Sequence, residues 1–208
     1  KGTVVAIIDT GINYSHDRLK DYMWTNKEEI VGDGIDNDGN GYIDDVYGWN
    51  FYSNSNIIYN DSNKYDDHGT HSAGILVNYL LKAEVSNVQI MSIKVLGGKN
   101  RKGTIKNLIK AVKYAEDMGA SICNISLGTT YNDLSLKKTI RDSDMLFVTA
   151  AGNGRIGSNI DKIPIYPSSY TMKNIISVAN ITSDSELHKT SNYGKVSVDI
   201  GAEGTKIY

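Results

Sequence analysis

The sequence contains little cysteine, little proline and no long apolar run. Cys123 is the only cysteine among 208 residues, so no disulfide can form within the chain, and stability must come from packing or metal ions. It lies in the apolar run SICNIS, which predicts a buried structural thiol. No stretch approaches the ~18 consecutive apolar residues of a membrane span, and the chain begins Lys1-Gly2-Thr3 before VVAIID, without a signal-peptide pattern. We expect no membrane span here and expect any targeting signal to have been removed or excluded.

An excess of charge of one sign is also absent. The 22 basic and 24 acidic residues leave a formal net charge of −2, which provides no global field to attract nucleic acid or an anionic membrane. Hydrophobic residues make up 40% of the chain and charged residues 22%, which is ordinary for a globular protein and argues against disorder. A chain of this length predicts a single compact domain over residues 1–208.

Strand-like and helical patterns alternate along the chain. The clearest helix begins after Thr104 and ends at Gly119, and a second is expected from Thr70 to about Leu81. This alternation predicts an α/β domain of three layers, α/β/α, with a mostly parallel, doubly wound sheet. Short apolar runs rich in β-branched residues give the expected strands, Val4–Ile8, Val88–Val95, Ile122–Ile125, Met145–Thr149 and Ile175–Val178.

Polar residues stand where several of these strands end. Asp9 ends the first strand, Ser126 follows the third, and Asn153 follows the fourth. The carboxyl ends of parallel strands meet at one edge of a sheet, where α/β proteins gather their chemistry. An aspartate there can orient an imidazole such as His68 and leave its other nitrogen free to take a proton from a nucleophile. Taken singly, the aspartate could serve in a turn and the histidine in the core.

Four short blocks, in chain order, resemble those of the subtilisin-like serine proteases: IIDTGI, HGTHSAG, NISLGT and FVTAAGN. The resemblance covers essentially the whole chain. It implies that Asp9 is the aspartate of a catalytic triad, His68 the general base, and Asn153 the side-chain donor of the oxyanion hole. His71 is expected to be structural.

The same resemblance implies a peptide or protein substrate that binds in an extended form. The enzyme backbone would pair with it along two edges, one on either side of the substrate. Ser126, Leu127 and Gly128 match one edge and a wall of the pocket for the residue before the cut, and Ala151 and Gly152 line another side. The second edge is expected at residues 98–103. There the family has a small Gly-x-Gly run, whereas this chain has Arg101-Lys102-Gly103.

Gly103 keeps its place, but Lys99, Arg101 and Lys102 add three cations to the rim of this edge. One hypothesis is a preference for acidic side chains upstream of the cut, weakened by salt. A solvated basic loop is the alternative.

Residues 22–67 form a long polar stretch, which we expect to be a surface insertion. Within it, oxygen-bearing side chains fall at the spacing of a calcium loop and are followed by a glycine for the sharp turn. The twelfth position is Tyr47 rather than glutamate, so a geometry different from an EF-hand is expected. A merely acidic, turn-rich loop is the alternative, and the predicted structural calcium ligands are Asp36, Asp38, Asn40, the Tyr42 carbonyl and Asp45.

The family's nucleophilic serine belongs to a Gly-Thr-Ser-Met-Ala block, and no such block occurs in this sequence. We expect these 208 residues to stop one short segment before it and to be inactive alone, as part of a serine endopeptidase. The alternative is a non-catalytic, calcium-stabilised peptide-binding relative, and a hydrolase of other acyl compounds is a third interpretation. A secreted or cell-surface bacterial location and a possible propeptide are further expectations, and the oligomeric state is left open.

Overall fold

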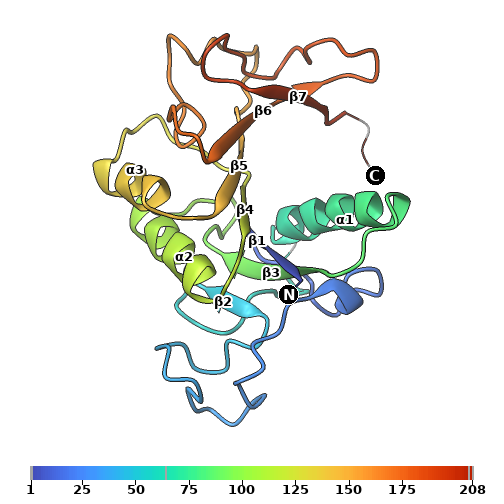
Figure 1. Cartoon of the computed structure of the whole chain (residues 1–208), viewed down its shortest axis with the longest axis vertical. Coiled ribbons are helices and arrows are strands. Elements are labelled where there is room, and N and C mark those ends of the chain that lie inside the picture. Colours follow the sequence, from blue (N-terminus) through green and yellow to red (C-terminus); the bar gives the residue numbers. More distant parts are fainter. Residues whose placement is uncertain (1, 64, 206, 208) are drawn as a thin grey trace. The chain divides into compact units, whose positions relative to one another are not determined.

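In the computed structural model, which describes residues 2–63, 65–205 and 207, the chain divides into two compact units, Lys1–Cys123 and Asn124–Tyr208 (Figure 1). We call them the first and second units and describe each by itself. Among the described residues no helix is long and apolar enough to cross a membrane.

A parallel sheet with the strand order β2-β3-β1 forms the centre of the first unit. Strand β1 (Thr3–Asp9) pairs with β3 (Val88–Lys94), and β2 (Gly48–Asn50) pairs with the other edge of β3. The register places Asp9 beside Lys94 at the carboxyl edge. Helices α1 (Asp67–Lys82) and α2 (Ile105–Asp117) lie on opposite sides of these strands (Figure 1), and a short 3-10 helix, η1, spans Lys20–Tyr22.

Both predicted helices are present. The Thr104 hydroxyl caps α2 by accepting from the Asn107 amide, and Gly119 follows the helix with φ +83°. Helix α1 begins at Asp67, three residues earlier than Thr70, so His68 lies in its first turn rather than before it. The early start reflects the close approach of Gly69 to β1, which apolar periodicity does not reveal.

The segment 22–67 contributes to the core instead of lying only on the surface. Trp24, Trp49, Phe51 and Ile58 are buried, and β2 joins the sheet. The Tyr42 ring contacts Trp49, Phe51 and Tyr114 at centroid distances of 5.1–5.5 Å. These buried residues were not predicted, because they are spaced by turns, without helical or strand periodicity.

Strand β4 (Ile122–Ile125) spans the boundary between the two units. In the second unit, strands β5 (Leu146–Ala150), β6 (Ile175–Ile181) and β7 (Ile200–Glu203) are parallel in that order. Helix α3 (Leu134–Arg141) precedes them, and the Asp133 side chain caps it through the Leu136 amide. Neither α3 nor β7 was predicted, because α3 is short and β7 is exposed along its length.

Candidate active site

Asp9 and His68, which are 59 residues apart in sequence, meet at the carboxyl end of β1. The two carboxylate oxygens of Asp9 lie 2.8 and 2.7 Å from His68 Nδ1. The Asp9 side chain is 1% exposed, while that of His68 is 40% exposed. The buried carboxylate therefore holds the proton on Nδ1, and Nε2 is left as the proton acceptor of a partly exposed ring.

The hydrogen bond to Asp9 raises the pKa of His68 above its ordinary value of 6.5. Burial of the ring and the nearby Arg101 act in the opposite direction, but the carboxylate outweighs them. A raised pKa makes the imidazole a stronger base and stabilises the imidazolium that forms when it accepts a proton.

His68 lies against Asp9 because the backbone of the first turn of α1 comes so close to the backbone after β1 that no side chain fits between them. A Cβ at Gly69 would lie 2.3 Å from the Gly11 carbonyl oxygen, so only glycine allows the first turn of α1 to approach the end of β1 this closely. The Gly69 amide donates to Thr10 Oγ1 at 3.0 Å, and the Thr10 amide donates to Asp9 Oδ1 at 2.6 Å. Each end of the pair is thus tied to the residue that follows Asp9.

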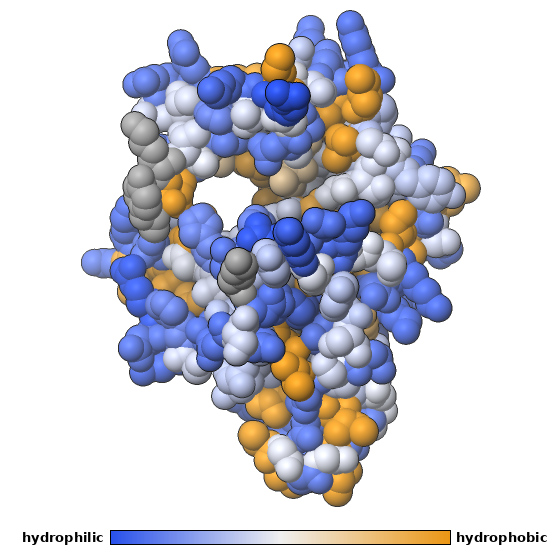
Figure 2. All heavy atoms as spheres, turned by 180° about the vertical axis from the view of Figure 1, so that it is seen from behind, coloured by the Kyte–Doolittle hydropathy of each residue, from blue (hydrophilic) through white to orange (hydrophobic). Residues whose placement is uncertain are grey.

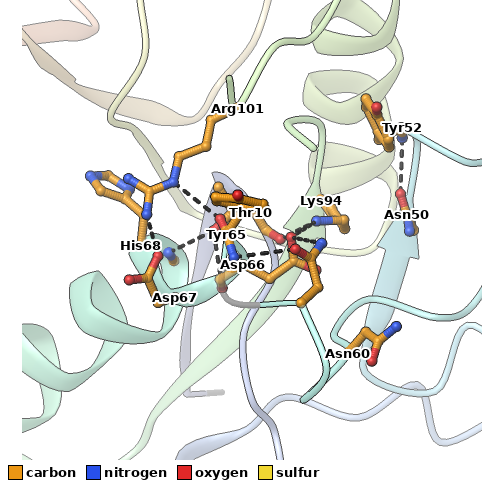
Figure 3. A network of polar contacts seen from close by, with 12 residues as sticks. Thr10, Asn50, Tyr52, Asn60, Tyr65, Asp66, Asp67, His68, Lys94 and Arg101 are labelled. Atoms are coloured by element: carbon orange, nitrogen blue, oxygen red, sulfur yellow. Dashed lines mark hydrogen bonds and ion pairs between the residues drawn. The ribbon is translucent and has the colours of Figure 1, made fainter. Parts of the chain in front are cut away.

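A pocket of about 430 Å³ opens beside His68 in the first unit. Arg101 crosses its rim, forming an ion pair with Asp67 and donating from Nε to the Tyr65 carbonyl oxygen at 3.1 Å (Figure 3). Arg101 is therefore ion-paired with Asp67 at this rim. The residues lining this pocket are Tyr59, Asp67, His68, Thr70, His71 and Arg101.

Gly103 lies in a tight loop after β3. Gly97 and Lys102 exchange backbone hydrogen bonds of 3.1 Å across this loop. A Cβ at Gly103 would lie 2.4 Å from the Val95 carbonyl oxygen, which explains why glycine stands at this predicted substrate-binding position.

The other predicted substrate-binding residues lie in the second unit. A Cβ at Gly128 would lie 2.7 Å from Ile165 Cγ2, and one at Gly152 would lie 3.8 Å from the same methyl group. The two predicted pocket walls, Ser126-Leu127-Gly128 and Ala151-Gly152, are thus brought together around Ile165. Ile165 was not predicted, since no local pattern marks it.

Asn153 is exposed and pairs with Ser191 in an isolated antiparallel bridge of the second unit. Gly152 precedes it with φ +91°, a conformation that favours glycine, and its carbonyl accepts from the Asn192 amide at 2.9 Å. The convergence of Asn153, Ser126 and the pocket walls on Asp9 and His68 stays a prediction.

The acidic loop brings together Glu29, Asp36 and Asp38, with one carboxylate oxygen of each within 4.8 Å of the others. Asp36 and Asp38 were predicted, but Glu29 was not, because it lies outside the spaced motif. Glu29 is 8% exposed and accepts the backbone amides of Asn37 and Asp44 at 2.8 and 2.9 Å. An all-oxygen donor set of this kind fits calcium.

The remaining predicted ligands have other partners in the first unit. The buried carboxylate of Asp45 accepts from the Tyr114 hydroxyl at 2.6 Å and from the Asn40 and Asn26 side-chain amides at 3.0 and 2.9 Å. Burial raises the pKa of Asp45 above its usual range. The Tyr42 ring belongs to the aromatic cluster with Tyr114, while its amide donates to Asn40 Oδ1 at 2.8 Å. Whether Asp45, Asn40 and Tyr42 bind an ion stays a prediction.

A buried aspartate that orients a partly exposed histidine at the end of a parallel strand is the arrangement of a hydrolase with a general base. The sequence profile of the Subtilase family matches residues 1–208, so the chain belongs to that family. Its members among the curated relatives described below are serine proteases.

Subtilisin-like protease 1 of Plasmodium berghei (strain Anka) is 30% identical over 99% of this chain and 38% of its own length. The major intracellular serine protease of Bacillus subtilis (strain 168) is 28% identical, over 100% of this chain and 59% of its own. The chain thus spans about two fifths of the first relative and three fifths of the second. Because one relative is intracellular, a secreted location stays a prediction.

The solved structure of a cold adapted subtilisin-like serine proteinase matches with a TM-score of 0.69 and 25% identity, over 99% of this chain and 64% of that one. A lanthipeptide protease matches with the same TM-score, 0.69, at 24% identity, over 97% of this chain and 55% of that one. The predicted three-layer α/β/α fold with a mostly parallel sheet is confirmed.

Proposed function

We propose that the whole protein is a serine endopeptidase for which this chain supplies the aspartate, the general base and the oxyanion donor. The observation that carries the proposal is the Asp9–His68 pair, in which a buried carboxylate holds Nδ1 and leaves Nε2 available. A neutral imidazole held in this tautomer is what a weakly acidic hydroxyl needs to become a nucleophile.

The proposed reaction is acyl transfer to water. A serine from residues outside this chain attacks the scissile carbonyl, and its proton passes to His68 Nε2. Asp9 stabilises the resulting imidazolium, and the Asn153 amide donates to the oxyanion. His68 then gives the proton to the leaving amine. Water then attacks the acyl enzyme with the same proton transfers through His68, which releases the acid and restores the serine.

An extended peptide is the proposed substrate, with the backbone of residues 126–128 and the loop at Gly103 as its two edges. The resemblance in sequence supports this assignment. Since Asp67 neutralises Arg101, an acidic preference upstream of the cut would depend on Lys99 and Lys102.

A fluorophosphonate probe tests the proposal directly. It should label the full-length protein at a serine, and labelling should require folded protein. Absence of label on protein that still binds extended peptides would overturn the protease and favour the non-catalytic, peptide-binding alternative.

We also propose a structural calcium ion in the acidic loop, held by Glu29, Asp36 and Asp38. Bound calcium would offset the repulsion of three carboxylates within 4.8 Å of one another. At calcium one hundred times its dissociation constant, binding adds ~2.7 kcal/mol to the free energy of unfolding.

Chelation should therefore lower the unfolding temperature of the full-length protein by about 5–10 °C. Millimolar calcium should restore it, as followed by calorimetry. In the Glu29→Gln variant most of this dependence should disappear, whereas Asp17→Asn, an exposed aspartate outside the loop, should keep it. An unfolding temperature indifferent to chelator in the wild-type protein would disprove the site.

A further inference from the structure

A buried ion pair lies next to the chain segments that carry Asp9 and His68. Lys94 is 5% exposed and Asp66 is 2% exposed, and Lys94 Nζ lies 2.7 Å from Asp66 Oδ1 (Figure 3). The ammonium also donates to the Thr10 carbonyl oxygen at 2.5 Å. The Asn63 side-chain amide donates to the same Asp66 oxygen at 2.9 Å.

The two ends of this pair attach to the two chain segments that carry the site. Thr10 follows Asp9, and Asp66 is the residue from which α1 begins, two positions before His68. A second contact joins the segments, because the Thr10 hydroxyl donates to the Asp66 carbonyl oxygen at 3.2 Å. Lys94 therefore links the segment that follows Asp9 to the segment that precedes His68.

Asp66 occupies the helix N-cap but does not cap the helix with its side chain. An N-cap aspartate ordinarily accepts a backbone amide of the first turn. Here the carboxylate accepts from Lys94 and Asn63 instead. The local contact that would stabilise α1 is absent, and a contact to Lys94, the last residue of β3, has taken its place.

We propose that Lys94 and Asp66 are positioning residues that fix the separation of the Asp9 carboxylate from the His68 ring. This inference rests on the proposed serine endopeptidase function. A buried ion pair is often replaceable by apolar side chains of similar volume without loss of stability, whereas its directed hydrogen bonds define geometry. Small displacements of catalytic groups reduce rates strongly.

The double variant Lys94→Met/Asp66→Leu removes both charges together, so no unpaired buried charge remains. In the full-length protein, kcat for a peptide substrate should fall roughly 10- to 100-fold with KM nearly unchanged, because only the reacting groups are displaced. The unfolding temperature should stay within a few degrees of that of the wild-type protein. The matched control, Lys138→Met/Asp142→Leu, removes an exposed pair of α3 and should change neither quantity.

An NMR titration of the His68 imidazole gives a readout that does not depend on activity. Asp9, Asp67 and Arg101 are the charged groups that act on His68, and the double variant leaves all three in place. Its His68 pKa should nevertheless fall toward 6.5, because the hydrogen bond to Asp9 becomes longer. Should the double variant not fold, Asp66→Asn, which keeps the size of the side chain but removes the charge that pairs with Lys94, is expected to shift the pKa in the same direction by less.

A folded double variant with unchanged kcat and unchanged His68 pKa would overturn the positioning role. A large loss of stability without a pKa change in the folded state would overturn it as well, because the pair would then be merely structural. If the wild-type protein had no protease activity, the proposed function would fail, while the titration would still decide the role of the pair.

Discussion

Replacing His68 with alanine should reduce the kcat of the full-length protein for a peptide substrate by about 10⁶-fold, the size of loss known for the corresponding change in subtilisin. Without Nε2, no group accepts the serine proton, and the remaining assistance comes from the oxyanion donor and substrate binding. KM should change little, because the ring acts on the reacting atoms. Steady-state kinetics, with circular dichroism to show that the variant is folded, would measure the effect.

His71→Ala is the matched control, because both histidines lie on α1 and line the same pocket. It should reduce kcat far less than His68→Ala does. The reverse order of the two variants would show that the general base has been assigned to the wrong histidine.

The Asp9→Asn variant should lose about 10⁴-fold in kcat while the fold is retained. The amide would donate to His68 Nδ1, which forces the proton onto Nε2 and leaves no acceptor facing the serine. Full activity in this variant would contradict the tautomer derived from the contacts of 2.7 and 2.8 Å.

The same variant should also change the dependence on pH. In the wild-type protein the raised pKa of His68 puts the acid limb of kcat/KM above pH 6.5, and in Asp9→Asn the limb should move to lower pH. A raised folded-state pKa stabilises the fold fully below the unfolded value and loses this contribution as pH rises through the folded value. The stability difference between the two proteins should thus be largest at acid pH, as measured by thermal unfolding at pH 5 and pH 9.

Sequence patterns predicted the elements whose apolar residues recur locally. Helix α2 shows this well, since Leu108, Ala111, Val112 and Ala115 are buried on one face and Thr104 caps it. Asp9 and His68 were also predicted, because parallel strands deliver their carboxyl ends to one edge and the family blocks mark both residues.

Contacts that join distant parts of the chain were not predicted. Glu29 reaches Asp36 and Asp38 through the backbone path of the loop, and the Arg101–Asp67 pair links residues 34 positions apart. Whether such residues meet depends on where the intervening turns place them in space. Composition and periodicity give no information about that placement. The buried Lys94 likewise reads in the sequence as an ordinary polar residue at the end of a strand.

Exposed apolar side chains were equally hard to foresee. In the acidic insertion, Ile30, Val31 and Ile35 are 62%, 76% and 57% exposed. Orange, hydrophobic residues also gather at the lower edge of the view in Figure 2, where Figure 1 draws the insertion. Backbone amides of this loop donate to its carboxylates, so polar contacts hold its turns and its exposed apolar side chains are not needed as a core.

The pairing of Asp9 with Lys94 also governs when the site can form during folding. Asp9 and His68 are 59 residues apart in sequence, and Lys94 and Thr10 are 84 apart. The Lys94–Thr10 contact can therefore form only after β1 has paired with β3. Contacts of such high sequence separation are slow to form, because loop closure must precede them. A nascent or partly unfolded chain thus carries no oriented base until β1 has paired with β3.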